Sequence, residues 1–229
     1  SRAASQAFGA DHGSKRTIIQ YNYSHDNEGG FFQAAARGKG PVPNDGAVVR
    51  YNISQNDEAN VFLLAGPVTN ARIYNNTIFL HDGLSTTLVS EFDDGGVPIG
   101  SLYSSNLFVN EGGRGLQVDA GKAHRFEANV VSREPAVALA AARGRAAGGF
   151  ARVEPHLERP GTGGEGIGSL DGYRIRAESE CRGLGVRQPD HPDRDFFGTP
   201  IASDAPIDAG AHQASSGGSR PDATPGSAG

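Results

Sequence analysis

The chain has 229 residues with a formal net charge of −5, is rich in glycine (33), and contains one cysteine but neither methionine nor tryptophan. This length is enough for one sizeable domain with a core of its own. The acidic balance argues against a nucleic-acid partner, and no apolar run approaches the roughly 18 residues that a membrane-spanning helix needs. The single cysteine, Cys181, excludes a disulfide within the chain.

Residues 1–16 are expected to form a poorly anchored lead-in. They contain no signal peptide, and a mature or truncated chain would not show one. Because the chain has no methionine at all, we expect it to be a processed protein or, preferably, a fragment of a longer one.

From residue 17 onward, one short pattern recurs around an asparagine. The shared asparagines are Asn22, Asn52, Asn76, Asn106 and Asn129, at spacings of 30, 24, 30 and 23 residues. A polar or glycine-rich break follows each asparagine, and a second β-prone run follows each break. These second runs are FFQ at 31–33, VFLL at 61–64, TTLV at 86–89, GLQV at 115–118 and AVAL at 136–139. Each period therefore predicts two or three short strands joined by turns.

The positions before each asparagine alternate in polarity. Three positions before it stand Ile19, Val49, Ile73, Tyr103 and Phe126, which are large and largely apolar. Two positions before it stand Gln20, Arg50, Tyr74, Ser104 and Glu127, which are mostly polar. This alternation is typical of a strand with one column of side chains pointing inward and the next pointing outward.

A period of this length, built from short strands and turns, predicts an all-β fold, a parallel β-helix solenoid with about five recognisable coils over residues 17–139. At each corner we expect the asparagine to adopt left-handed backbone angles, and the stacked amides to bond to one another. A β-sandwich is the alternative, but it predicts no fixed asparagine column.

The C-terminal third of the chain is less regular. Residues 140–213 are expected to form a segment that caps or covers the solenoid, and the Gly/Ser/Pro-rich residues 214–229 a disordered tail. Within this region only ALAAARGRAA, residues 138–147, has real helix propensity.

Several segments resemble the right-handed parallel β-helix repeat proteins of the pectate-lyase-like superfamily. The repeats YNYSHDNEGGF (21–31) and VRYNISQND (49–57) carry this resemblance, as do GIGSLDGYRIRAESECRGLG (166–185) and RDFFGTPIASDAPIDAGAHQ (194–213). The sequences ESECRG and DAGAHQ depart from the usual closing turns of the family. The resemblance covers about residues 17–213 and implies a right-handed solenoid with further coils before residue 17.

The resemblance also implies carbohydrate chemistry, because the superfamily includes polysaccharide lyases, glycoside hydrolases and esterases, mostly secreted. We therefore expect a secreted, monomeric protein that acts on a polysaccharide or oligosaccharide, as part of a polysaccharide-degrading hydrolase or lyase. The alternative is a non-catalytic β-helix module that binds glycans or serves as a scaffold. Fold alone does not decide between them.

The polar breaks of the first two coils supply the candidate catalytic residues. Aligned on the corner asparagine, residues 26–28 match residues 56–58, so acids on adjacent rungs would lie roughly 5 Å apart, as in a retaining glycosidase. The catalytic candidates are His25, Asp26, Glu28, Asp57 and Glu58. Two alternatives stay open: ordinary turn residues, and a Ca²⁺ site built from carboxylate and amide oxygens. No cofactor is required and no metal ligand is assigned.

Two further groups are candidates for binding substrate. The sequence SEFDDGG, residues 90–96, is expected to be an extended loop whose Glu91, Asp93 and Asp94 form a wall beside the substrate. Arg50, pointing outward from the second coil, would bind an acidic sugar together with Arg37 and Lys39. Scattered solubilising charge is the alternative interpretation for these basic residues.

Overall fold

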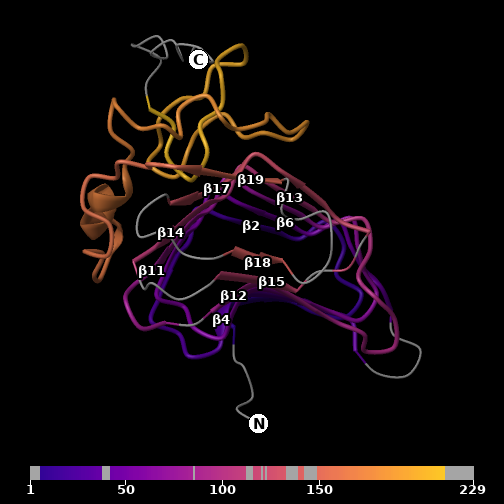
Figure 1. Ribbon diagram of the computed structural model, residues 1–229. Coiled ribbons are helices and arrows are strands. Elements are labelled where there is room, and N and C mark those ends of the chain that lie inside the picture. The colour runs from indigo at the N-terminus through magenta and orange to yellow at the C-terminus, as the bar shows by residue number, and fades with distance from the viewer. Residues whose placement is uncertain are drawn as a thin grey trace, which may run out of the picture.

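The computed structural model describes residues 6–37, 42–84, 86–111, 116–119, 121, 123–132, 139–141 and 149–214. Within these residues the chain folds as a parallel β-solenoid with three long sheets, viewed nearly along the stacking direction in Figure 1. Every long sheet is parallel, as expected when the chain returns to the same face once per turn. The fold class predicted from the repeat is confirmed.

We call the three long sheets the first, second and third sheet. The first consists of β1 (Phe8–Ala10), β4 (Gly30–Ala35), β8 (Asn60–Ala65), β12 (Thr87–Phe92), β15 (Leu116–Asp119) and β18 (Leu139–Ala141). The second consists of β2 (Ile18–Gln20), β6 (Val48–Arg50), β10 (Arg72–Tyr74), β13 (Leu102–Ser104) and β16 (Arg125–Glu127). The third consists of β3 (Tyr23–His25), β7 (Ile53–Gln55), β11 (Thr77–Leu80), β14 (Leu107–Asn110), β17 (Asn129–Ser132) and β19 (Phe150–Val153).

A small fourth sheet of β5 (Asn44–Asp45) and β9 (Val68–Thr69) lies in the turns that lead from the first sheet to the second. The five strands of the second sheet, β2, β6, β10, β13 and β16, define rungs one to five, separated by four turns of the solenoid. These rungs correspond to the five predicted coils.

The asparagine column forms the predicted ladder at the corner between the second and third sheets. Each side-chain amide donates to the Oδ1 of the next, at 3.1 Å from Asn22 to Asn52, 2.9 Å on to Asn76, 2.9 Å on to Asn106 and 3.0 Å on to Asn129. All but the first of these asparagines are fully buried. Because every amide is paired, the ladder satisfies its buried polar groups and fixes the register of the rungs.

One detail of the corner differs from the prediction. The residue with left-handed backbone angles is the one before each asparagine, for example Tyr51 with φ 51° and Asn75 with φ 51°. The amide of the following asparagine then donates back across this residue, as from Asn52 to the Arg50 carbonyl at 3.0 Å. The asparagine therefore supplies the hydrogen bonds while its neighbour turns the chain.

The apolar column points into the solenoid, as predicted. Val49, Ile73 and Tyr103 belong to one buried core cluster together with residues of the other two sheets, and Ile19 and Phe126 pack against its ends. Aromatic side chains stack along this column, with the Tyr103 and Phe126 rings 4.7 Å apart and nearly parallel. The strand alternation read from the sequence is confirmed here.

A second core lies outside the solenoid, between the third sheet and the chain that follows it. We call residues 154–214 the cap, which includes the 3-10 helix η2 (Ile167–Tyr173). Outward-facing Ile53, Leu107 and Val130 of the third sheet form one buried cluster with cap residues, among them the free Cys181. Figure 1 shows the cap lying against this flank of the stack. The cap therefore covers a side of the solenoid.

Of two expectations about the C-terminal part of the chain, one is wrong and one concerns residues that the structure does not describe. The stretch 138–147, which has helix propensity, contributes strand β18 in its described part, because stacking on β15 in a parallel sheet overrides local preference. The predicted tail, residues 215–229, lies outside the described residues. Among the described helical segments, none is long and apolar enough to cross a membrane.

Candidate functional site

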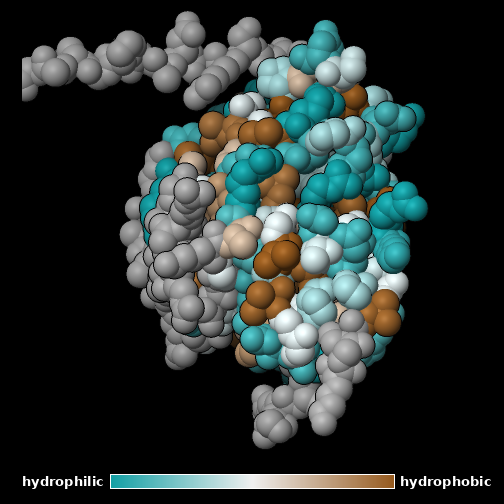
Figure 2. All heavy atoms as spheres, turned by 90° about the vertical axis from the view of Figure 1, so that its right-hand side faces the viewer, coloured by the Kyte–Doolittle hydropathy of each residue, from teal (hydrophilic) through white to brown (hydrophobic). Residues whose placement is uncertain are grey.

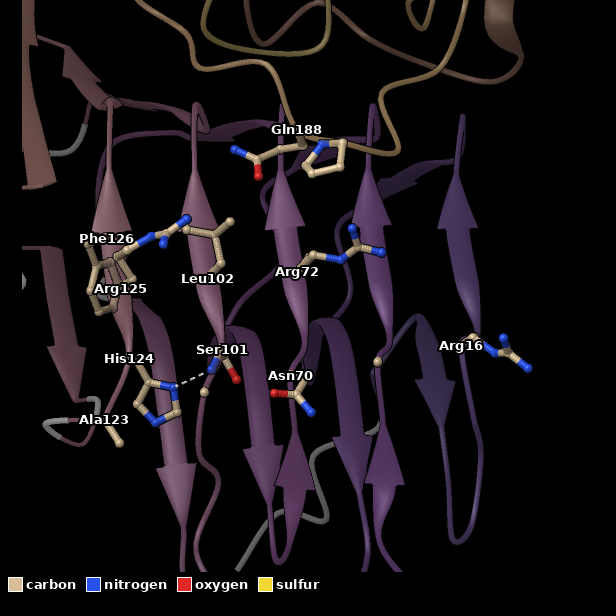
Figure 3. Close-up of a pocket in the computed structure, with 13 residues that line it drawn as sticks. Arg16, Asn70, Arg72, Ser101, Leu102, Ala123, His124, Arg125, Phe126 and Gln188 are labelled. Carbon is tan, nitrogen blue, oxygen red and sulfur yellow. Dashed lines mark hydrogen bonds between the residues drawn. The ribbon is translucent and has the colours of Figure 1, made fainter.

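A groove of about 980 Å³ runs over the outer surface of the second sheet, at the start of its strands. Figure 3 shows its residues spread along the row of parallel strands, from Arg16 at one end to Arg125 at the other. The groove therefore follows the stacking direction of the solenoid and crosses all five rungs. Neighbouring rungs of such a sheet are about 4.8 Å apart.

Two columns of the repeat form the floor of the groove. Six positions before the corner asparagines stand Arg16, Gly46, Asn70, Gly100 and Ala123. Four positions before them stand Ile18, Val48, Arg72, Leu102 and Arg125, which pair with one another in register across the sheet. Eight of these ten residues line the groove, all except Ile18 and Val48.

The cap supplies one wall of the groove through Gln188 and Pro189. The Gln188 amide donates to Ser104 Oγ at 3.3 Å and to Glu127 Oε1 at 3.2 Å, which attaches this wall to rungs four and five. The next residue, Asp190, forms an ion pair with Arg72 at 2.6 Å. The wall is therefore held by polar contacts to the same strands that form the floor.

Apolar side chains gather beside the groove, on the turns between the first and second sheets. The large exposed apolar residues of these turns are Val42, Val97 and Ile99, and Phe92 at the end of β12 adjoins them. Figure 2, which faces these turns, shows brown hydrophobic residues grouped among teal hydrophilic ones. Ile99 directly precedes Gly100, but the residues stacked with it on the other rungs are Lys15, Asp45 and Thr69, so this rim of the groove is mostly polar.

Behind the floor lies a buried polar cluster. The His124 ring accepts a hydrogen bond at Nδ1 from the Ser101 amide, at 3.1 Å, and its Nε2 lies 3.1 Å from Glu91 Oε2. Glu91 also accepts from the Gly121 amide at 2.7 Å. Burial first, and the Glu91 charge second, hold the pKa of Tyr103 well above its usual range. Both ring nitrogens of His124 are engaged and its side chain is fully buried, so it shapes the groove rather than contacting a ligand.

This position of Glu91 corrects the predicted loop. Glu91 lies within strand β12 in register with the core residue Leu64, and its side chain is 7% exposed. The loop begins only after Phe92. On this loop Asp93 is exposed and Asp94 is half-buried. There Asp94 lies 3.8 Å from Arg37, whereas Lys39 is outside the described residues.

Arg50 points outward from its strand, as predicted, but the cap covers it. Its Nε donates to Gln20 Oε1 at 2.8 Å, and its Nη1 donates to Tyr74 Oη at 2.9 Å and to the Asp190 carbonyl. The Asp190 carboxylate lies 3.5 Å away. These contacts attach the cap to the sheet and leave the side chain 11% exposed.

The candidate catalytic turns stack rung on rung as the alignment predicts, but two of the three matched pairs join one carboxylate to one amide, and only the third, Glu28 with Glu58, matches two acids. The Asn56 side chain donates to Asp26 Oδ1 at 3.2 Å, and the Asn27 side chain donates to Asp57 Oδ1 at 2.6 Å. Asp57 is fully buried and also accepts from Ser54 Oγ at 2.6 Å. At these two positions an acid alternates with an amide, so the two carboxylates do not stack directly on each other.

The other candidates in these turns face solvent. His25 and Asp26 are exposed and form a pair, with Nδ1 2.9 Å from Oδ2. Glu28 and Glu58 are also exposed. Among the described residues, no group of three or more His, Cys, Asp or Glu side chains is arranged to hold a metal ion.

The groove residues were missed in the sequence, although a signal for them was present. Arg72 and Arg125 share one position relative to the corner asparagine, and Arg16 and Asn70 share another. These groove residues are found when the alignment is extended from three to six positions before the asparagine. What the alignment could not provide is the wall formed by Gln188, which is 61 residues away from Glu127.

No protein-family model matches this chain. Among curated proteins it is similar to a lacto-N-biosidase of Bifidobacterium longum subsp. longum, with 28% identity over 219 residues. The match takes in 86% of this chain and 13% of the relative, so the chain spans about an eighth of that protein's length. The similarity is distant, and it links this solenoid to a protein named for its action on a sugar.

Proposed function

We propose that this chain is a glycan-binding part of a carbohydrate-active protein, and that the groove over the second sheet holds a sugar chain. The observation that carries the proposal is the course of the groove across all five rungs. A floor that repeats about every 4.8 Å suits a polymer of similar units better than a compact ligand. The proposal includes secretion, which the resemblance to mostly secreted β-helix proteins implies.

The lining residues support a polar, hydroxyl-rich ligand. Asn70 offers an amide that both donates and accepts, Gln188 offers the amide oxygen because its NH2 group already donates to Ser104 and Glu127, and the guanidinium groups of Arg16, Arg72 and Arg125 donate only. Sugar hydroxyls pair with both kinds of group. The distant similarity to lacto-N-biosidase independently favours a carbohydrate as the ligand.

Binding is favoured over hydrolysis within the groove. None of the described residues that line it is a carboxylate, whereas glycoside hydrolysis generally uses a pair of Asp or Glu residues.

A second candidate function is hydrolysis at the polar turns of the first two rungs. Two observations favour it: the relative is named as an enzyme, and His25, Asp26, Glu28 and Glu58 are exposed. In this alternative Asp57 is a structural residue that holds the turn, because it is buried and accepts three hydrogen bonds. Release of reducing ends from polysaccharides incubated with the whole chain, lost in Asp26→Asn, Glu28→Gln or Glu58→Gln, would support it.

The binding proposal is tested with a panel of neutral and acidic oligosaccharides, using the whole chain and isothermal titration calorimetry. Ala123→Trp places a large side chain in the groove from an exposed turn position, and Ala177→Trp places the same side chain on an exposed turn of the cap. We expect Ala123→Trp to abolish binding and Ala177→Trp to preserve it. If no sugar of the panel binds, or if Ala123→Trp binds as well as the unmodified chain, the proposal is wrong.

A further inference from the structure

We infer that the groove selects an acidic glycan that carries its negative charges on every second sugar. The inference rests on the proposed glycan-binding function and adds the charge pattern of the ligand. It comes from the order in which arginines and uncharged residues follow one another along the floor of the groove.

The arginines occupy alternate rungs. Arg16 belongs to rung one, Arg72 to rung three and Arg125 to rung five, and Figure 3 shows Arg16 just before β2, Arg72 on β10 and Arg125 on β16. With neighbouring rungs about 4.8 Å apart, successive arginines start about 10 Å apart along the groove. Two sugar rings in an extended chain span a similar length.

Rungs two and four place uncharged residues between these arginines. Gly46 comes from rung two, and Gly100 and Leu102 come from rung four. Gly100 has φ +73° and a Cβ there would meet Asn70 Oδ1 at 3.0 Å, so this backbone requires glycine and the floor stays low. A neutral sugar fits above such a position, where a charged one would find no cation.

The arginines remain able to bind an anion. Arg125 pairs with Glu127 at 3.2 Å, yet its side chain is 69% exposed. Arg72 uses one Nη1 hydrogen bond to Asp190 and has no other side-chain partner among the described residues. Arg16 is exposed and forms no ion pair with a described residue. Since a guanidinium has five N–H donors, each arginine keeps donors for a carboxylate or a sulfate.

The charge balance of the groove differs from that of the chain. The chain carries a net charge of −5, whereas the described lining contains three arginines and no carboxylate. The carboxylates beside the lining, Asp190 and Glu127, pair with Arg72 and Arg125 but leave some of their N–H donors free. Its one aromatic residue, Phe126, stacks on Tyr103 inside the solenoid and offers no open ring face to a sugar. Recognition in this groove therefore depends on charge and hydrogen bonds, which favours an acidic ligand.

The test compares three oligosaccharides of equal length that differ in charge spacing. Hyaluronan alternates an acidic and a neutral sugar, polygalacturonate has a carboxylate on every sugar, and chitin oligosaccharide is uncharged. Affinities are measured by calorimetry in low salt for the whole chain and for Arg16→Gln, Arg125→Gln and the control Arg159→Gln. Arg159 is an exposed arginine of the cap that does not line the groove.

We expect the hyaluronan oligosaccharide to bind more tightly than the other two. Arg16→Gln and Arg125→Gln should each weaken its binding about tenfold, as expected for loss of a charge-assisted hydrogen bond. Arg159→Gln should leave it unchanged. Both groove arginines are exposed, so circular dichroism should show that the variants fold.

Two results would overturn the inference and leave the proposed function in place: equal affinity for hyaluronan and either comparison sugar, or unchanged hyaluronan affinity in both groove variants. In each case Ala123→Trp must still abolish binding. Absence of binding to every sugar would overturn the proposed function as well.

Discussion

Arg50 and Arg125 both point outward from strands of the second sheet, but they lie in different surroundings. The side chain of Arg50 is 11% exposed, and that of Arg125 is 69% exposed. Arg50 stands near the end of its strand, where the cap crosses the sheet, and Arg125 stands at the start of its strand, in the groove. The comparison teaches that strand alternation decides the direction of a side chain and that the cap decides whether solvent reaches it.

The covered part of the second sheet behaves as an interface within one chain. Tyr74 is fully buried there and forms a small core with Val48 and Tyr51. The Tyr51 hydroxyl lies 3.0 Å from His191 Nε2, and the His191 and Tyr74 ring centroids are 5.9 Å apart. Apart from Val48 at the start of β6, the first residues of these strands lie outside this core, and Arg16 and Arg125 stay exposed, so stability and binding are expected to depend on different halves of the strands.

The largest expected effect comes from removing the aromatic contact under the cap. Tyr74→Ala should lower the free energy of unfolding by about 3–5 kcal/mol, because it deletes a fully buried ring and leaves a cavity. The matched change in the same sheet is Ile18→Ala, at an exposed position, which should change it by less than about 0.5 kcal/mol. Urea unfolding measures both. Similar losses in the two variants would contradict the division into covered and open halves.

A pair of arginine substitutions sharpens the same comparison. Arg50→Gln should lower the free energy of unfolding by about 1–3 kcal/mol, because it leaves buried partners of the guanidinium unsatisfied. Arg125→Gln should change it by about 0.5 kcal/mol or less, since exposed ion pairs contribute little. The expected pattern reverses for glycan affinity, which Arg125→Gln should reduce. Equal stability losses would show that the cap does not hold Arg50.

The smallest expected effect is a dependence of stability on pH that arises from the cap. Burial, reinforced by nearby arginines, lowers the pKa of His191 and of His212 to about 4. Their pKa in the unfolded chain is about 6.5. Between these values the unfolded chain binds more protons, so stability falls as the pH drops from 6.5 toward 4. Thermal unfolding should show Tm decreasing as the pH is lowered through this window.

Two cap carboxyl groups act in the opposite direction. Burial raises the pKa of Asp195 and of Asp208, so the folded chain holds extra protons just above pH 3.8 and is stabilised there as the pH falls. The histidine effect should therefore be clearest between pH 6.5 and 5. His191→Gln should flatten the profile in that window, and a profile unchanged by this substitution would contradict the assignment to His191.

The candidate catalytic turns show how far the aligned repeat can predict. The alignment placed residues 26–28 beside residues 56–58, and the structure does so, with Glu58 N donating to the Asn27 carbonyl at 2.8 Å. It did not foresee that Asp57 is buried against Ser54 while Asp26 faces solvent. An acid in a repeated turn can hold the turn by accepting hydrogen bonds, or it can act as a catalytic group. The sequence pattern is the same in both cases.

The sequence by itself determined the solenoid. The spacing of the asparagines set the rungs, and the alternation before them set the inward column, because both follow from backbone geometry within a few residues. Only the tertiary structure decided which outward positions stay open. Arg50 and Asp190 are 140 residues apart in the chain, as are Tyr51 and His191. Whether the cap covers an outward side chain depends on where this distant, irregular segment packs. The local repeat of the sequence does not specify that position.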